Sequence, residues 1–283
     1  MKGAWITDQG ATEVTSAFRV TRRLHEERTP YQHLEVYDSP LFGRMLLLDG
    51  AVQTTEGDEF IYHEMLAHPA LCTHPRPRHA LVIGGGDGGL LEEALKHPLD
   101  RVTVVEIDEA VVRASRAYLG TVSGAAFDDP RAALVIADGA AYVEEGGDRF
   151  DVVFVDSTDP QGPAAGLVSP AFYAQVARRL TPEGLLAVQS GSAIYQQDMI
   201  TTVRRHLRAL FPVVRTYLAT VPTYPAVLWS FTVASLGPDP LRVHPEEITR
   251  RTHDFKLRYY SPAGHLAAFD LPRFIRDQIE EEG

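Results

Sequence analysis

Cysteine is almost absent from this sequence of 283 residues, because Cys72 is the only one. No disulfide can form within the chain, and the cysteine usage gives no sign of an oxidising compartment. A pair of cysteine ligands for a metal ion is excluded for the same reason. Cys72 lies in an apolar stretch between Leu71 and Thr73, so we expect its side chain to be buried and unreactive.

Positive charge is also in short supply. Lysine and arginine number 27 against 38 acidic residues, which gives a formal net charge of −11 at pH 7. This balance argues against binding to nucleic acid or to an anionic membrane, and it is compatible with a cationic substrate. No signal-peptide core is seen, and the longest uncharged run, 216–238, is interrupted by prolines. We therefore expect a cytoplasmic protein with no nucleic-acid or membrane partner.

Several common catalytic motifs are missing. There is no Gly-x-Ser-x-Gly elbow of a serine hydrolase, and no P-loop with its lysine and hydroxyl residue. The segment 63–68 resembles the zinc-binding helix of metalloproteases, but its two histidines are one position too far apart to share a helix face. We expect none of these three chemistries and no metal ion.

Along the chain, short strands and turns give way to an alternation of strands and helices. Before residue 60, β-type patterns over 17–24, 31–37, 45–48 and 51–54 are separated by Pro, Gly and Asp-Gly turns and predict a small antiparallel sheet. A helix is predicted over 58–71, and the alternation beyond it predicts a parallel sheet with helices on both faces. The run 216–238 predicts two strands joined by a turn. The strands expected in the second region are 80–83, 101–107, 133–137, 150–156, 184–190, 213–220 and 228–234.

The apolar strand from Ala80 to Ile83 runs into a glycine-rich turn, Gly84 to Gly89, and a leucine-rich helical pattern follows at once. A strand, a Gly-x-Gly-x-x-Gly turn and a helix form the nucleotide-binding unit of doubly wound sheets, because glycine lets the backbone turn tightly and approach a ligand. Asp87 stands inside this turn, where a carboxylate would repel a phosphate. The turn is therefore expected to face a neutral or cationic group.

Acidic residues follow each of the first four strands of the α/β region, at Asp87, Glu106, Asp138 and Asp156. Ligands of an open parallel sheet bind outside the carboxyl ends of its strands, so these acids should converge on one site. Glu106 follows the glycine turn by about twenty residues, where an acid hydrogen-bonds a ribose diol. Asp138, with Gly139, is placed for an adenine amino group, although an Asp-Gly pair also forms turns and helix caps.

Asp156 and Asp159 share the loop after the fourth strand, which Pro160, Gly162 and Pro163 stiffen. A turn or helix cap would be the purely structural role for such a pair. The loop carries almost no other charge, and other acids are expected nearby. We therefore favour a functional role for both residues.

These motifs resemble the spermidine synthases, members of the polyamine aminopropyltransferase family, over nearly the whole chain. The similar segments are Trp5, Tyr31–Gln32, 48–54, 58–65, 83–89, 106–108, 138–139, 156–163, 222–225, Tyr259–Tyr260 and 265–269. The resemblance implies a small antiparallel β-domain, residues 1–60, before a Rossmann-like, methyltransferase-type α/β catalytic domain, residues 61–283. It also implies a homodimer or a homotetramer.

The resemblance further implies transfer of an aminopropyl group from decarboxylated S-adenosylmethionine, a cosubstrate, to a diamine acceptor, usually putrescine. The products would be spermidine and methylthioadenosine, and neither a cofactor nor a metal would take part. The residues implied to hold the nucleoside and its aminopropyl arm are Gln32, His63, Asp87, Glu106, Asp138 and Gly139. The residues implied to hold the diamine are Tyr62, Asp156, Asp159 and Tyr224, with Asp159 as the proton acceptor.

Two positions depart from the family pattern. Ala226-Val227 stand where Ser-Gly often follows the segment 222–225, and Gly57 replaces the usual arginine before Asp58. Both could lie near the acceptor pocket, so agmatine or spermidine remains an alternative acceptor to putrescine.

Two other functions compete with aminopropyl transfer. An S-adenosylmethionine-dependent amine N-methyltransferase is disfavoured by Asp87, which would meet the carboxylate of the methionine moiety. A non-catalytic protein that binds polyamines or nucleosides is disfavoured by the presence of Asp159.

Overall fold

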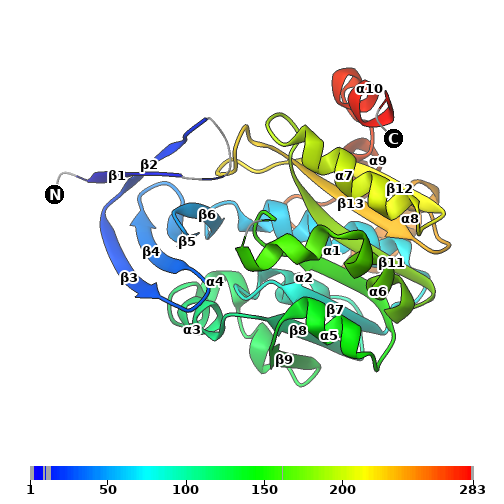
Figure 1. Ribbon diagram of the computed structural model, residues 1–283, viewed down its shortest axis with the longest axis horizontal. Helices are drawn as coiled ribbons and strands as arrows, with labels where there is room; N and C mark the ends of the chain where they lie inside the picture. The colour runs from blue at the N-terminus through cyan, green and yellow to red at the C-terminus, as the bar shows by residue number, and fades with distance from the viewer. Residues whose placement is uncertain (1–2, 9, 11–13, 161, 282–283) are drawn as a thin grey trace.

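The computed structural model describes residues 3–8, 10, 14–160 and 162–281 (Figure 1). Its N-terminal part consists of two antiparallel sheets, which Figure 1 shows to one side of the molecule. The first pairs β1 (Ala4–Thr7) with β2 (Ala17–Val20), and the second has β3 (Arg22–Arg28), β4 (His33–Ser39), β5 (Gly43–Leu48) and β6 (Ala51–Thr55). The predicted small antiparallel β-domain is confirmed.

The N-terminal strands differ from the prediction in two details. β1 was not expected, and the strand expected over 17–24 is interrupted at Thr21, where the chain passes from the first sheet to the second. A four-residue strand such as β1 is too short for a periodic pattern, so its pairing with β2 decides its conformation.

Helix α1 (Glu59–Thr73) connects the two parts of the chain, and every residue from Ile61 to Thr73 is buried. A helix that is buried on all sides lies in the interior, and this one packs between α2 and the strands β10, β11 and β12. Its first turn places Tyr62 and His63 at the edge of the central sheet. The predicted boundary between the two domains, at residue 60, stays a prediction. Helix α1, which links the two parts of the chain, begins at Glu59.

The central sheet has seven strands in the order β12-β13-β11-β10-β7-β8-β9. All run in the same direction except β13, which is antiparallel to both of its neighbours. The strands are β7 (His79–Gly84), β8 (Arg101–Glu106), β9 (Ala132–Ile136), β10 (Phe150–Asp156), β11 (Leu180–Ser192), β12 (Val213–Thr220) and β13 (Leu228–Ser235). The expectation of a parallel sheet holds for six of these strands, and β12 and β13 form the expected pair joined by a turn.

Helices cover both faces of this sheet, and alternate residues of each strand pack against opposite layers. Ala80 and Val82 face α1 and α2, whereas Leu81 and Ile83 face α5 and α6. The helices between the strands are α2 (Gly89–Leu95), α3 (Glu109–Tyr118), α4 (Gly120–Ser123), α5 (Gly139–Glu145), α6 (Pro170–Arg179) and α7 (Gln197–Arg208). The C-terminal helices are α8 (Pro245–Thr252), α9 (Pro262–Ala268) and α10 (Arg273–Glu281).

The two parts of the chain share a hydrophobic cluster. Leu34 and Leu46 of the N-terminal sheet pack with Val111 of α3 and Val122 of α4. Among the helices that the structure describes, none is both long and apolar enough to cross a membrane. Cys72 is buried, as expected, and burial raises the pKa of its thiol to about 12.

The loop between β12 and β13 has a strained backbone at Ala226 and Val227. Ala226 and Val227 have φ values of +59° and +63°, in the left-handed region that favours glycine. A β-branched residue in this region is disfavoured by roughly 1–2 kcal/mol. Hydrogen bonds from Val227 N to Tyr224 O and from Val221 N to Val227 O hold the turn closed.

We expect the substitution Val227→Gly to stabilise the protein, because the side chain is exposed and its removal relieves the left-handed strain. The gain should be about 0.5–1 kcal/mol once the larger unfolded-state entropy of glycine is subtracted, or a rise of about 2 °C in Tm. Thermal unfolding monitored by circular dichroism measures it. As a control, Val243→Gly should lower Tm, because Val243 has an ordinary φ of −73°. A fall in Tm for Val227→Gly would contradict the inference that the backbone at Val227 is strained.

Candidate functional site

A cavity of about 460 Å³ lies at the carboxyl ends of the parallel strands. Four neighbouring strands, β9, β8, β7 and β10, bring one acid each to this edge, in the order Asp138, Glu106, Asp87 and Asp156. The structure brings all ten predicted site residues to the lining of this one cavity. They are Gln32, Tyr62, His63, Asp87, Glu106, Asp138, Gly139, Asp156, Asp159 and Tyr224.

The glycines of the turn after β7 allow its backbone to pack closely against β10 and α1. Gly84 has a φ of +85°, and a Cβ atom there would lie 2.0 Å from the carbonyl oxygen of Asp156. A Cβ atom on Gly89 would lie 2.2 Å from the ring of His63. Any larger residue at either position would therefore push the turn away from β10 or from α1.

Glu106 lies at the end of β8 and is 7% exposed. Its two carboxylate oxygens accept hydrogen bonds from Gly86 N, at 3.2 Å, and from Asp108 N, at 2.9 Å. Burial raises the pKa of Glu106 to about 7, although these hydrogen bonds act in the opposite direction. A carboxyl group of this kind can hydrogen-bond a diol in either protonation state.

Asp138 serves as the N-cap of α5, because its Oδ1 accepts from Ala140 N at 2.8 Å and from Ala141 N at 3.1 Å. Asp138 therefore does act as a helix cap, and this role uses one of its two carboxylate oxygens. Gly139 has no room for a side chain, since a Cβ atom would lie 2.3 Å from Ile83.

Gln32 reaches the cavity from the turn between β3 and β4. Its amide nitrogen donates to Asp108 Oδ2 at 3.0 Å, and Thr29 Oγ1 donates to the same oxygen at 2.7 Å. Asp108 also caps α3 through its other oxygen. One carboxylate thus ties the N-terminal sheet to the α/β sheet and leaves the amide oxygen of Gln32 as an acceptor.

His63 stands between two carboxylates in the interior and is 2% exposed. Its Nδ1 lies 2.8 Å from Glu59 Oε2, and its Nε2 lies 3.3 Å from Asp87 Oδ2. A neutral imidazole carries one N–H and would leave one carboxylate facing a lone pair, so this geometry favours the imidazolium. Burial opposes the charge, but Asp87 and Glu59 together raise the pKa of His63 well above its usual value.

Asp87 is the partner of this imidazolium within the glycine turn. Its Oδ1 accepts from Gly89 N at 3.0 Å. Burial favours the neutral acid, but the charge and hydrogen bond of His63 lower the pKa of Asp87 below its usual value. His63, Asp87 and Asp156 each have a nitrogen or oxygen atom within 4.8 Å of the others, but a protonated imidazole has no lone pair with which to bind a metal ion.

Asp156 accepts a hydrogen bond from the hydroxyl of Tyr62 at 2.7 Å. Burial, followed by the charge of Asp87, raises the pKa of Asp156 to about 6. Asp159 accepts from Gln196 Nε2 at 2.6 Å, and burial also raises its pKa. Both carboxyl groups are therefore better proton acceptors than an exposed aspartate.

Tyr224 forms the opposite wall of this part of the cavity. Its ring centroid lies 5.6 Å from that of Tyr62, and its hydroxyl donates to Gln53 O. Asp58 holds the loop before it, since its Oδ2 accepts from both the backbone N and the hydroxyl of Thr223. The position of Tyr224 is thus set by contacts from β6 and from the start of α1.

Residues outside the ten predicted ones also support or line the site. Glu59 pairs with His63, Gln196 orients Asp159, and Asp58 holds the loop that carries Tyr224. Glu59 and Asp58 occur in the similar segment 58–65, but no spacing in the sequence links Gln196 to a residue 37 positions earlier. Other polar and aromatic residues of the lining are Asp8, Tyr31, Asp49, Gln53, Ser157, Thr158, Gln189 and Trp229.

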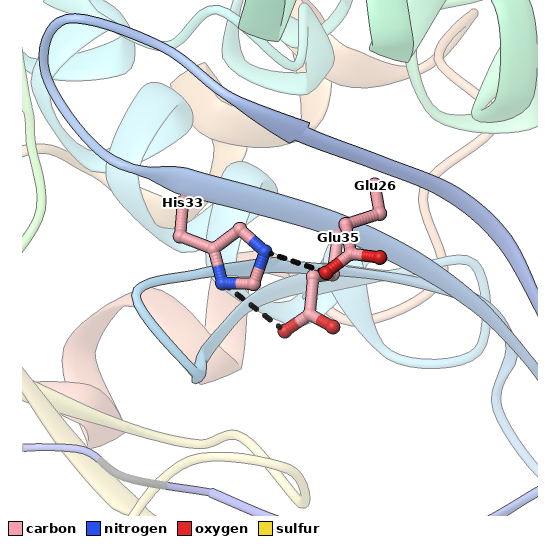
Figure 2. A group of neighbouring side chains, drawn as sticks. All are labelled: Glu26, His33 and Glu35. Carbon is pink, nitrogen blue, oxygen red and sulfur yellow. Dashed lines mark hydrogen bonds and ion pairs between the residues drawn. The ribbon is translucent and has the colours of Figure 1, made fainter.

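A second group of potential metal ligands lies outside this cavity, on β3 and β4. Figure 2 shows His33 between Glu26 and Glu35, with its ring nitrogens 3.1 Å from Glu26 Oε1 and 3.8 Å from Glu35 Oε2. Arg23 pairs with both carboxylates, at 2.7 Å and 3.3 Å. Each carboxylate already faces basic side chains of this chain, so we describe the group as an ion-pair network.

The sheet order, the single antiparallel strand and the glycine turn define a Rossmann-like α/β protein of the methyltransferase type, preceded by a small β-domain. The spermine/spermidine synthase domain matches residues 59–240, and the spermidine synthase tetramerisation domain matches residues 4–56. This chain therefore belongs to the spermine/spermidine synthase family.

Individual relatives agree with this assignment. A polyamine aminopropyltransferase of Desulforudis audaxviator is 48% identical over 276 residues, which cover 97% of this chain and 98% of the relative. One of Moorella thermoacetica is 46% identical over 281 residues, with 99% and 98% covered. A solved spermidine synthase in complex with the transition-state analogue AdoDATO has a TM-score of 0.94 at 37% identity, with 98% of this chain and 95% of that chain covered. The spermidine synthase of Thermotoga maritima has a TM-score of 0.90 at 36% identity, with 98% and 94% covered.

The raised pKa of Glu106 predicts that the protein loses stability as the pH rises. Between its usual pKa of 4.5 and about 7, the native state keeps a proton that the unfolded chain has lost. The proton-linked stability is full below pH 4.5 and disappears above pH 7, a change of up to about 3 kcal/mol. Denaturant unfolding at pH 4.5 and at pH 7.5 should show a smaller decline for Glu106→Gln than for the wild type. Equal declines in the two proteins would contradict the assignment, and the exposed Glu145→Gln on α5 is the matched control.

Proposed function

We propose that this protein is a polyamine aminopropyltransferase that transfers the aminopropyl group of decarboxylated S-adenosylmethionine to putrescine. The products are spermidine and methylthioadenosine. The single observation that carries the proposal is that four neighbouring strands each bring a carboxyl group to the same edge of the sheet. These groups line one cavity together with two tyrosines. A cavity of this kind suits a neutral nucleoside at one end and cationic amines at the other.

The nucleoside occupies the end over β8 and β9 in this proposal. Glu106 receives the ribose hydroxyls, as an acid at the end of the second strand does in related sheets. Asp138 offers the adenine amino group the carboxylate oxygen that the helix cap leaves free, and Gly139 lets the base approach the backbone. Gln32 contributes its amide oxygen from the N-terminal sheet.

The aminopropyl arm extends towards Asp87 and His63. Decarboxylated S-adenosylmethionine has an ammonium group where S-adenosylmethionine also carries a carboxylate. Asp87 attracts the ammonium and repels the carboxylate. The negative charge on Asp87 is stabilised by the imidazolium of His63, which Glu59 holds on its other side.

The acceptor diamine lies between Tyr62, Asp156, Asp159 and Tyr224. Its ammonium groups interact with the two carboxylates and with the faces of the two tyrosines. An amine with a pKa near 10.4 is neutral in about one molecule per few thousand at pH 7, a cost of roughly 4.6 kcal/mol. The positive sulfonium of the bound cosubstrate disfavours a neighbouring ammonium, so the proton passes to a carboxylate when both substrates are present.

The chemical step is a direct displacement. Asp159 accepts the proton of the attacking nitrogen, whose lone pair then forms a bond to the methylene carbon beside sulfur. The carbon–sulfur bond breaks, its electron pair stays on sulfur, and neutral methylthioadenosine leaves. A neutral thioether leaves without Lewis-acid assistance, so the step itself requires no metal. Alignment of the two substrates can contribute up to about 7–11 kcal/mol.

A chromatographic assay for methylthioadenosine tests the proposed function. The purified protein is incubated with decarboxylated S-adenosylmethionine and one acceptor from a panel of putrescine, cadaverine, agmatine and spermidine. Putrescine should give the highest kcat/KM. A higher value with agmatine or spermidine would change the acceptor, while methyl transfer from S-adenosylmethionine would favour the N-methyltransferase alternative.

The tetramerisation domain matched over residues 4–56 supports a homo-oligomer. We propose a homodimer or a homotetramer that acts in the cytoplasm. Sedimentation at several protein concentrations distinguishes the two assemblies.

Replacement of the proton acceptor should abolish most of the turnover. Asp159→Asn cannot take the proton at neutral pH, so we expect kcat to fall by about 10²–10⁴-fold while methylthioadenosine still binds. Steady-state kinetics and calorimetry measure the two properties. Asp128→Asn, at an exposed carboxylate paired with Arg116, is a matched control that should keep wild-type turnover. Near-normal turnover by Asp159→Asn would overturn its assignment as the proton acceptor.

Replacement of Asp87 should change which cosubstrate the protein prefers. In Asp87→Asn the ammonium of the aminopropyl arm loses a charged partner, so the affinity for decarboxylated S-adenosylmethionine should fall by about 10- to 100-fold. The carboxylate of S-adenosylmethionine is no longer repelled, so the affinity for that compound should fall less. Calorimetric titration should show that the variant prefers decarboxylated S-adenosylmethionine over S-adenosylmethionine by a smaller ratio of affinities than the wild type does. An unchanged ratio would show that Asp87 does not discriminate between them.

A further inference from the structure

A pair of histidines is buried in the core between α1 and the residues that follow α2. His68 lies on α1, His97 lies just after α2, and both side chains are buried. His68 Nδ1 lies 2.9 Å from His97 Nε2, and His68 Nε2 lies 3.0 Å from Glu93 Oε2. Neither histidine lines the cavity, and the proposed function uses neither of them. The two rings therefore form a separate titratable cluster in the interior.

The geometry of this cluster limits the number of protons that it can hold. Burial acts to raise the pKa of Glu93, but hydrogen bonds and charge from His68 and Lys96 lower it to about 2, so Glu93 is ionised. His68 therefore carries a hydrogen on Nε2, the atom that faces this carboxylate. The two ring nitrogens 2.9 Å apart share one further hydrogen. A second hydrogen between them would place two N–H groups against each other, so the pair holds at most one positive charge.

The surroundings of His97 also oppose a second charge. Burial lowers the pKa of His97 well below its usual value, and positive charge on His68, Arg251 and Lys96 adds to this effect. Several elements contribute titratable or charged groups around the pair. These groups are Glu93 of α2, Lys96 after it, Arg131 before β9, Arg251 of α8 and the phenol of Tyr260.

The segment 253–261, which connects α8 to α9, covers the pair. The ring centroid of Phe255 lies 4.9 Å from that of His97 and 5.9 Å from that of His68. The ring centroid of Tyr260 lies 5.2 Å from that of His68. The structure describes all of this segment and finds neither helix nor strand in it. Its position therefore depends on side-chain packing of this kind.

The same segment is attached to α1 beside the cavity. Glu64 is 1% exposed, and its carboxylate accepts hydrogen bonds from the backbone N–H groups of Arg258, Tyr259 and Tyr260 at 2.7–2.9 Å. Glu64 directly follows His63, which lines the cavity. A displacement of the segment would leave this buried carboxylate without its donors, so the displacement would also affect the first turns of α1.

We propose that His68 and His97 form an acid-sensitive clamp that holds the segment 253–261 against α1 and α2. At neutral pH the two rings share one hydrogen and the segment packs over them. When the pH falls, a second proton enters the pair, the hydrogen bond between the rings is lost and the segment is released. The inference goes beyond the proposed function and does not rest on it, because the clamp lies outside the cavity.

Hydrogen exchange of backbone amides, measured by mass spectrometry on the full-length protein at pH 7.5 and pH 5.0, tests the clamp. Labelling times are scaled to the intrinsic exchange rate at each pH. In the open state His97 regains an ordinary pKa near 6.5, so opening should be favoured by up to about 30-fold at pH 5.0 relative to pH 7.5. Peptides from 253–261 should lose protection accordingly, those from β11 should not, and a return to pH 7.5 should restore the protection.

The substitution His97→Gln separates the hydrogen bond from the titration. Its amide N–H can still donate to His68 Nδ1, but the amide takes up no proton. Protection of 253–261 in this variant should change by less than about threefold between the two pH values. His79→Gln, at an exposed histidine that begins β7, is the matched control and should respond to pH as the wild type does.

Three results would overturn the clamp. Unchanged protection of 253–261 at pH 5.0 in the wild type would do so, whether or not His97→Gln folds. Equal losses in the wild type and His97→Gln would assign the response to other groups. Equal losses in 253–261 and in β11 would show acid unfolding of the whole protein. The measurement needs no enzymatic activity, so a failure of aminopropyl transfer would leave this test intact.

Discussion

The site depends on one constraint, the burial of several carboxyl groups in a cavity whose described lining contains no lysine or arginine. Burial of an unpaired charge is expensive, so the fold has to stabilise each group by other means. Asp87 is paired with the imidazolium of His63, whereas the other groups have neutral donors: backbone N–H groups for Glu106, a phenol for Asp156 and a side-chain amide for Asp159. These donors hold the carboxyl groups in place without neutralising them, and the cavity keeps its attraction for cations.

Helix α1 shows how one element serves both stability and the site. Its buried residues form part of the main hydrophobic cluster, so the position of its first turn is fixed by packing that extends along its whole length. Tyr62 and His63 in that turn reach Asp156 and Asp87. On another side, Glu64 accepts hydrogen bonds from the backbone N–H groups of Tyr259 and Tyr260 and so fixes the segment before α9. The acids at the sheet edge are therefore oriented by a helix that cannot move independently of the core.

Much of this arrangement could be predicted from the sequence, because it follows from local patterns. Alternation of strands and helices indicates a parallel sheet, and a parallel sheet brings Asp87, Glu106, Asp138 and Asp156 to the same edge wherever each strand ends. The supporting contacts could not be predicted in this way. Gln196 meets Asp159 because β10 and β11 are neighbours and the loops that follow them come into contact, and β1 is recognisable only through its pairing with β2. Such contacts depend on the distance between elements, which no periodicity in the sequence encodes.

The protonation of the site follows from the same constraint. Glu106 and Asp156, with pKa values of about 7 and 6, hold protons more readily than exposed acids because burial disfavours their charge. A cation brought into the cavity reverses this effect for the groups that it touches and lowers their pKa. By linkage, the binding of a cationic ligand and the loss of a proton from Asp156 favour each other. A dication placed between Asp156 and Asp159 would therefore lower the pKa of the carboxyl groups that bind it, whereas a neutral ligand of the same shape would not.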